Sequence, residues 1–357
     1  MLGGTIVDLM ALLKAAVDRG GSDVYIVPGA PATVKVGAQL QPLMDEKLGM
    51  DGTQALIEGA YALAGKREIT RLAEKGDDDF SFSVRDIGRF RCNTYKQRGS
   101  YAAVLRAVPF GLPDYRALGI PQVVMDLCAK RRGMILVTGP AGSGKSTTLA
   151  CMIDRINRET ASHIITLEDP IEYLHPHQKS IVSQREIALD AADFAGALRA
   201  ALRQAPDVIL LGEMRDFETI QTALTAAETG HLLLSSLHTL GAAKTIDRIV
   251  DVFPAAQQAQ VRVQLSMVLL AVVSQQLIPT VDGGLAPAME VMVVTPAISN
   301  MIREGKGHQI DNAIYAGSAQ GMISMDEDIL KLFRAGRITR DFALSYAINP
   351  DIMGKKI

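Results

Sequence analysis

A glycine-rich loop between an apolar strand and a helix is the feature that most constrains this chain. An apolar run at 134–138 leads directly into Gly-Pro-Ala-Gly-Ser-Gly-Lys-Ser at 139–146, and residues 147–157 follow with amphipathic helical spacing. Glycines in such a loop let backbone N–H groups point inward and surround phosphate oxygens together with the helix N-terminus. The order strand, loop, helix therefore predicts an α/β domain that binds nucleotide phosphates.

Each part of this loop has an expected role. Lys145 is expected to reach the β- and γ-phosphates, and the Ser146 hydroxyl is expected to bind Mg²⁺. The residues predicted to hold the nucleotide through this motif are Gly139, Pro140, Ala141, Gly142, Ser143, Gly144, Lys145, Ser146 and Thr147. The expected cofactors are ATP and Mg²⁺.

Three later apolar runs end in polar side chains. They are residues 163–167 before Glu168, residues 207–211 before Gly212 and Glu213, and residues 232–237 before His238. Parallel strands end at one edge of a sheet, where ligands bind. Phosphoryl transfer needs a metal, a positioned water and positive charge near the γ-phosphate. We therefore expect Glu168 to orient the attacking water, Glu213 to act on Mg²⁺ or its waters, and His238 to bond the γ-phosphate.

These residues also have purely structural interpretations. A carboxylate at a strand end often caps the next helix. In isolation His231 is more typical of a structural histidine than of a ligand, and Asp169 is consistent with holding its own loop. The combination favours a nucleotide site, because all three runs follow the glycine-rich loop.

The order of motifs resembles that of the secretion and type IV pilus ATPases, and within them the PilT family of pilus retraction motors. The resemblance rests on residues 139–146, 165–172, 183–186, 211–216 and 229–239. It implies a RecA-like ATPase domain preceded by a small PAS-like α+β domain. It also implies that Glu168 is the catalytic glutamate, that Glu213 is associated with the metal, and that His231 and His238 form a histidine pair at the nucleotide.

The chain is expected to contain two domains. Alternating strand patterns indicate a small α+β domain over residues 1–108. A linker rich in turn-forming residues is expected over 109–118, followed by the α/β ATPase domain over 119–357. A helical segment from about 296 to 357 is expected to end the chain.

Two arginines in the first domain are further candidates. A hairpin with its turn at Arg98 and Gly99 places Arg91 opposite Arg106, and like charges so placed favour an anionic partner. The alternative is a solvated strand face without a ligand. The family resemblance implies that Arg91 and Arg106 reach nucleotide at a subunit boundary, with Arg98 a third candidate. Such arginine fingers require a ring, and the resemblance implies a homohexamer.

Composition limits the partners and the compartment. The net charge of −2 and the absence of a basic, aromatic-rich strip argue against nucleic acid and a DNA-handling motor. The three cysteines are too far apart for a paired-cysteine metal motif. The N-terminus lacks a secretory signal pattern, and the apolar run at 265–273 is too short to span a bilayer. We expect a cytoplasmic protein without direct membrane insertion, peripheral at the inner face of the cell membrane through the pilus machine.

The resemblance favours retraction over assembly. Assembly ATPases typically carry an additional N-terminal domain and a four-cysteine zinc site, and this sequence shows neither. Residues 297–304 resemble the retraction signature, with Ser299 in place of an arginine and Met301 in place of a leucine. We predict a hexameric ATPase that powers pilus disassembly and twitching motility by acting on an inner-membrane platform protein, with a second pilus ATPase as an optional partner. The alternatives are an accessory PilU-like ATPase, a minimal assembly or secretion ATPase, and a nucleotide-regulated binding module with little hydrolysis.

Overall fold

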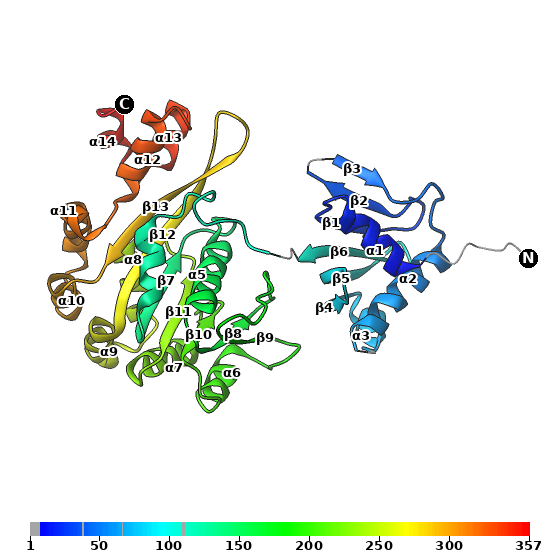
Figure 1. The fold of residues 1–357 in the computed structure, drawn as a ribbon, viewed down its shortest axis with the longest axis horizontal. Helices are drawn as coiled ribbons and strands as arrows, with labels where there is room; N and C mark the ends of the chain where they lie inside the picture. The colour runs from blue at the N-terminus through cyan, green and yellow to red at the C-terminus, as the bar shows by residue number, and fades with distance from the viewer. Residues whose placement is uncertain (1–7, 38, 66, 109–110) are drawn as a thin grey trace, which may run out of the picture. The chain divides into compact units, whose positions relative to one another are not determined.

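The computed structural model describes residues 8–37, 39–65, 67–108 and 111–357. The main division in sequence falls between Gly111 and Leu112 and separates two compact units (Figure 1). The first seven residues of the expected N-terminal domain and the first two residues of the expected linker, 109–110, lie outside the described residues.

The first unit is an α+β unit built on a six-stranded antiparallel sheet with strand order β3-β2-β1-β6-β5-β4. Its elements are α1 (Leu9–Asp18), β1 (Asp23–Ile26), β2 (Thr33–Val36), β3 (Gln39–Pro42), α2 (Met50–Leu63), α3 (Thr70–Lys75), β4 (Asp77–Val84), β5 (Gly88–Gln97) and β6 (Ser100–Val108). Leu13 of α1 and Ile57 of α2 pack with Phe90 of β5 in one core, and all three side chains are fully buried. The predicted α+β class of this part of the chain is confirmed.

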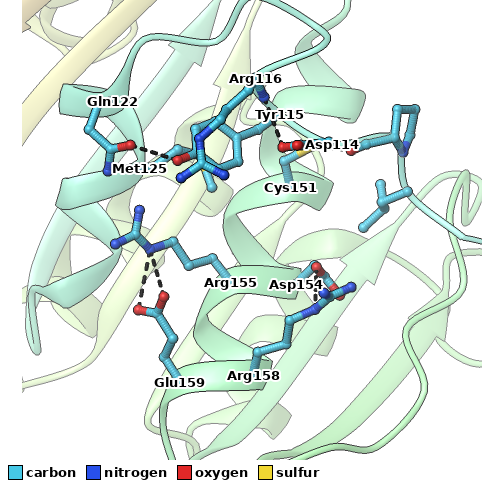
Figure 2. A pocket seen from close by; sticks show the side chains of 12 residues that line it. Asp114, Tyr115, Arg116, Gln122, Met125, Cys151, Asp154, Arg155, Arg158 and Glu159 are labelled. Carbon is cyan, nitrogen blue, oxygen red and sulfur yellow. Dashed lines mark hydrogen bonds and ion pairs between the residues drawn. The ribbon is translucent and has the colours of Figure 1, made fainter.

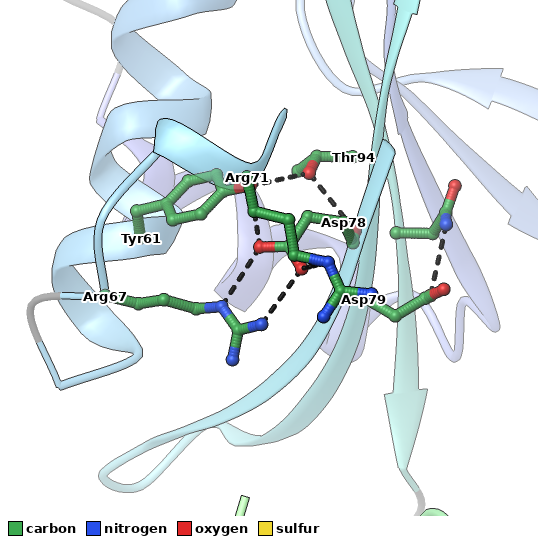
Figure 3. A network of polar contacts seen from close by, with 7 residues as sticks. Tyr61, Arg67, Arg71, Asp78, Asp79 and Thr94 are labelled. Carbon is green, nitrogen blue, oxygen red and sulfur yellow. Dashed lines mark hydrogen bonds and ion pairs between the residues drawn. The ribbon is translucent and has the colours of Figure 1, made fainter. Parts of the chain in front are cut away.

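A buried carboxylate joins the helices of the first unit to its sheet. Asp78 is fully buried and accepts two hydrogen bonds from Arg67, at 3.0 Å from Nε and 2.9 Å from Nη2 (Figure 3). Arg71 Nε lies 3.3 Å from the same carboxylate. The Tyr61 hydroxyl lies 3.1 Å from Asp78 and 2.9 Å from Thr94. Burial raises the pKa of Tyr61 to about 12, and the neighbouring Asp78 charge adds to the effect.

The second unit has a seven-stranded sheet with strand order β13-β12-β7-β11-β10-β8-β9. Its strands are β7 (Gly133–Thr138), β8 (His163–Glu168), β9 (Ile181–Glu186), β10 (Val208–Leu211), β11 (Leu232–Leu237), β12 (Leu269–Pro279) and β13 (Leu285–Val293). All neighbouring pairs are parallel except β12 with β13. The first helices of this unit are α4 (Gln122–Asp126), α5 (Lys145–Glu159), α6 (Phe194–Ala201), α7 (Phe217–Glu228), α8 (Ala242–Asp251) and α9 (Ala255–Val268).

Helices cover both faces of this sheet, as the alternation of side chains along β7 shows. Met134 and Leu136 belong to one core cluster, which includes residues of α6 to α9. Ile135 and Val137 point to the other face and join a cluster with residues of α4 and α5. A parallel strand buried on both faces reads as a continuous apolar run, which is why residues 134–138 lack polar alternation. The predicted RecA-like α/β core is confirmed.

The chain ends in short helices: α10 (Pro296–Arg303), α11 (Ile310–Ala316), α12 (Met325–Arg334), α13 (Arg340–Tyr346) and α14 (Pro350–Gly354). This helical ending agrees with the prediction. Ser299, which replaces the arginine of the retraction signature, donates a hydrogen bond from Oγ to the Ser266 carbonyl oxygen at 2.6 Å. Ser299 therefore joins α10 to α9.

The described part of the expected linker contributes side chains to the second unit. Leu112, Tyr115 and Leu118 are partly buried against the core on the α5 side. No helix among the described residues is both long and apolar enough to cross a membrane.

Candidate nucleotide site

The register of the parallel strands brings the predicted catalytic side chains to one edge of the sheet. Leu237 pairs with Thr138, so His238 follows its strand beside the start of the glycine-rich loop. The end of β10 pairs with the ends of β11 and β8. Glu213 and Glu168 therefore lie at the same carboxyl edge as the loop. The structure brings Glu168, Glu213 and His238 together at this edge.

The conformation of the loop fits a phosphate-binding cradle. Gly139 has φ of +143°, and a Cβ there would lie 2.2 Å from the carbonyl oxygen of Gln275 on β12. Gly144 has φ of +86° and directly precedes α5, so Lys145 and Ser146 occupy the first turn of the helix. The N–H groups of a first turn have no partner within their own helix, and the helix dipole favours an anion there. The loop geometry, with Lys145 and Ser146, therefore fits a magnesium nucleotide.

Lys145 is held inside the loop. Its side chain is buried, and Nζ donates to the carbonyl oxygens of Gly139 and Pro140 at 2.9 Å each. Two hydroxyl oxygens nearby, Thr138 Oγ1 and Ser143 Oγ, are buried without a hydrogen-bond partner in the described part of the chain. Buried hydroxyl groups without partners are uncommon. These two can still form hydrogen bonds beside the loop.

Glu213 lies between Arg215 and His238 at the end of β10. Its Oε2 accepts a hydrogen bond from Arg215 Nε at 2.6 Å and lies 3.4 Å from His238 Nε2. The preceding carbonyl group, that of Gly212, accepts a 2.6 Å bond from Ser236 Oγ of β11. Arg215 was not among the site residues predicted from sequence, although its position two residues after Glu213 was a usable signal.

The Glu168 carboxylate is oriented by two neighbours. Thr166 Oγ1 donates to Glu168 Oε1 at 2.6 Å, and Gln184 Nε2 donates to the same oxygen at 3.2 Å. Gln184 is fixed in turn, because its Oε1 accepts from the His175 backbone N–H at 2.8 Å. Thr166 and Gln184 were not among the site residues predicted from sequence.

The helix-cap interpretation applies to a different carboxylate. Asp216 is the N-cap of α7 and accepts from the Thr219 backbone N–H at 2.9 Å. Burial on its own would raise the pKa of Asp216, but the hydrogen bonds from Thr219 lower it overall. Within the described part of the chain, neither Glu168 nor Glu213 caps a helix.

The structure does not bring His231 into this site. His231 directly precedes β11, whereas His238 directly follows it. A six-residue strand spans about 20 Å, so the two histidines lie at opposite edges of the sheet. His231 Nδ1 lies 2.9 Å from the Ala226 carbonyl oxygen, which is a local structural contact.

The arginine candidates lie on the hairpin that the sequence predicted. Gln97 pairs with Ser100 around a turn at Arg98 and Gly99, where φ is +47° and +78°. In this register Arg91 is directly opposite Arg106, and both side chains are exposed. The predicted cross-strand placement is confirmed.

A separate pocket of about 520 Å³ lies beside the middle and end of α5 (Figure 2). Its charged side chains largely pair with one another, as in the ion pairs Arg155–Glu159 and Arg158–Asp154. Tyr115 donates to Gln122 Oε1 at 2.6 Å across its rim. No residue of the glycine-rich loop lines this pocket, so it is distinct from the site at the sheet edge.

Comparison with known proteins identifies the family. The model of the family described as "Type II/IV secretion system protein" matches residues 4–315. The type IV pilus retraction ATPase PilT of Pseudomonas aeruginosa is 44% identical over 344 residues, which cover 96% of this chain and 99% of that protein. The type IV pilus ATPase PilU of the same organism is 40% identical over 337 residues, covering 94% of this chain and 87% of that protein.

A solved structure agrees with these sequence matches. The crystal structure of the pilus retraction motor PilT with bound ADP superposes with a TM-score of 0.89 at 46% identity, and the match covers 98% of this chain and 99% of that chain. The family match spans most of the sequence, and the PilT relative matches nearly the whole of both chains. The chain therefore belongs to the Type II/IV secretion system protein family and, within it, to the PilT-type retraction ATPases.

Proposed function

We propose that this chain is an ATP-hydrolysing motor that powers type IV pilus retraction, and with it pilus disassembly and twitching motility. The observation that carries the proposal is the convergence of Glu168, Glu213 and His238 on the edge where the glycine-rich loop begins. Near full-length similarity to a pilus retraction ATPase supports the biological setting.

The loop residues 139–147 hold the nucleotide, with Lys145 placed on its outer phosphates and Ser146 on Mg²⁺. Bound Mg²⁺ would supply neutralising charge at the phosphates. Glu213 orients the metal or its waters, Glu168 orients the attacking water, and His238 hydrogen-bonds the γ-phosphate. The bonds from Thr166 and Gln184 to Glu168 support its role, because a group that positions water needs a fixed orientation.

Arg91 and Arg106 act as arginine fingers on the nucleotide of a neighbouring subunit in a homohexamer. Arg91 and Arg106 are exposed and directly opposite each other on neighbouring strands, and this supports the role because like charges so placed favour an anionic partner. A closed ring of identical head-to-tail interfaces supplies each finger in trans. The ring works at the cytoplasmic face of the membrane on a pilus platform protein. His231 lies away from the nucleotide of its own subunit, so any nucleotide role for it also requires a neighbour.

An accessory PilU-like ATPase is the second candidate, favoured by the 40% identity to PilU. Complementation separates the two. In a strain lacking its retraction ATPase but retaining its accessory ATPase, this chain should restore twitching motility if it is the principal motor. Failure in that strain, with rescue of a strain lacking only the accessory ATPase, would favour the PilU-like function.

ATP turnover tests the catalytic assignment against a binding module with little hydrolysis. Glu213→Ala should abolish turnover, whereas Glu159→Gln, an exposed carboxylate at the far end of α5, should leave it unchanged. Activity should also rise with protein concentration in step with hexamer formation. A wild-type protein that binds ATP but turns it over no faster than Glu213→Ala would support the binding module instead.

A further inference from the structure

Strand β12 lies directly beside the glycine-rich loop. Ser274 of β12 pairs in parallel with Thr138 of β7, so the next residue, Gln275, lies beside Gly139. The contact is close, because a Cβ on Gly139 would lie 2.2 Å from the Gln275 carbonyl oxygen. A Cβ on Gly144, at the other end of the loop, would lie 3.1 Å from Gln275 Nε2. Gln275 therefore touches both ends of the loop.

Both polar atoms of the Gln275 side chain are used on the loop and its helix. Nε2 donates to the Ser143 carbonyl oxygen at 2.5 Å, and Oε1 accepts from Thr148 Oγ1 at 2.9 Å. Gln275 is only 1% exposed, so water does not compete for these bonds. The amide group joins the last turn of the loop to the first turn of α5.

The bond to Ser143 also fixes the direction of a neighbouring N–H group. In a planar trans peptide the C=O and N–H groups point in opposite directions. Because Gln275 holds the Ser143 carbonyl oxygen toward β12, the Gly144 N–H points away from β12. A phosphate cradle depends on such N–H groups being oriented before the ligand arrives.

We propose that Gln275 is a positioning residue for nucleotide binding: its amide holds the glycine-rich loop in the conformation that accepts phosphates. The proposal rests on the nucleotide binding proposed above for residues 139–147. Gln275 acts through the loop and needs no contact with the nucleotide. Losing its amide would leave the buried Ser143 carbonyl group unpaired and free the peptide plane to rotate.

The adjacent residue provides a matched control. Gln276 is also a buried glutamine on β12. Its Nε2, however, donates to the carbonyl oxygen of Tyr346, at the end of α13, at 3.2 Å. Gln275→Leu and Gln276→Leu each remove one buried amide from the same strand. Comparable losses in melting temperature are expected for the two variants, whereas only the first should disturb the loop.

The test measures the Kd of a fluorescent ADP analogue, together with kcat and KM for ATP. Gln275→Leu should raise Kd and KM about tenfold, because nucleotide binding must then also order the loop, and a tenfold change in Kd corresponds to about 1.4 kcal/mol. Gln276→Leu should stay within about twofold of wild type, since it leaves the loop contacts intact. Wild-type values in folded Gln275→Leu, or equal losses of affinity in both variants, would overturn the proposal.

Gln275→Glu tests the proposal without removing the side chain. It keeps the length and the acceptor, but the ionised carboxylate has no donor for the Ser143 carbonyl oxygen. At about pH 8 the ADP affinity of Gln275→Glu should therefore be weaker than that of wild type at the same pH, because an ionised carboxylate only accepts hydrogen bonds. Wild-type ADP affinity in folded Gln275→Glu at about pH 8 contradicts the proposal.

Lys145→Ala separates this inference from the proposed function. If wild type binds the analogue and Lys145→Ala does not, nucleotide binding at the loop is supported. The Gln275 variants then test the role of Gln275 alone. If wild type does not bind the analogue, nucleotide binding at this loop and the role of Gln275 are both wrong.

Discussion

Arg106 and Asp23 are cross-strand neighbours on β6 and β1, and Arg106 Nε donates to Asp23 Oδ1 at 2.8 Å. The Asp23 side chain is 9% exposed, whereas that of Arg106 is 67% exposed. Burial on its own would raise the pKa of Asp23, but the bonds from Arg106 and Ser22 lower it overall. The ionised Asp23 carboxylate therefore binds Nε of Arg106, while most of the Arg106 side chain stays exposed to solvent. This arrangement orients an arginine for an external anion without burying it.

Replacing Arg106 should therefore affect hydrolysis more than folding. We expect Arg106→Ala to assemble into the wild-type oligomer and to lose about 100-fold or more in kcat, because fingers of this kind stabilise transition-state charge. Steady-state ATPase assays and size determination on the same samples measure both effects.

Arg85→Ala is the matched control, since its side chain is 95% exposed on the neighbouring β4–β5 turn. It should retain wild-type kcat. Full activity in assembled Arg106→Ala, or an equal loss in Arg85→Ala, would rule out a finger role for Arg106.

Glu168→Gln should separate nucleotide binding from hydrolysis. The substitution keeps the shape of the side chain but removes the charge that polarises an attacking water, so kcat should fall about 100-fold or more. ADP binding should stay close to wild type, because Glu168 is not part of the loop. Stopped turnover with preserved ADP affinity supports the assignment, and near-normal turnover contradicts it.

The local parts of this fold were predictable from sequence because short-range rules determine them. The glycine-rich loop lies between an apolar run and a helix, and both elements follow from spacing alone. The pairing of Arg91 with Arg106 was predictable for the same reason, because a two-residue turn at Arg98 and Gly99 determines the hairpin register.

The long-range contacts were not predictable in this way. Gln275 lies 132 residues after Ser143, and no periodicity indicates that β12 inserts beside β7. The Asp78 network was missed because its partners come from different elements of the first unit. His231 shows the opposite case: the apolar run at 232–237 already separates it from His238 by a full strand, whereas the family resemblance paired the two.

Asp78 should be important for the stability of the first unit. Asp78→Asn leaves Arg67 and Arg71 without their buried carboxylate, and breaking a buried ion pair of this kind costs about 3 kcal/mol or more. Asp79→Asn is the control, because Asp79 is exposed beside Asp78 and accepts one bond from Asn93. That change should cost about 0.5 kcal/mol or less. Denaturant unfolding measures both free energies, and equal values would contradict a structural role for the network.

His175 should make the second unit less stable in mild acid. The residue is 8% exposed, and its Nδ1 has no hydrogen-bond partner among the described residues. Burial lowers the pKa of His175 to about 4. Between its ordinary pKa and this lowered value, the unfolded chain binds a proton that the folded chain does not. The free energy of unfolding should therefore fall by about 2 kcal/mol through this residue between about pH 7 and pH 5.

The variant His175→Gln isolates this contribution, because glutamine stays neutral and the other titrating groups are common to both proteins. Relative to wild type, the variant should gain about 2 kcal/mol in the free energy of unfolding as the pH falls from about 7 to about 5. His308→Gln, at an exposed position, controls for the loss of one imidazole. Denaturant unfolding at each pH gives the three curves. If the difference between His175→Gln and wild type stays constant with pH, His175 carries a proton in the folded state and its buried environment does not suppress the charge.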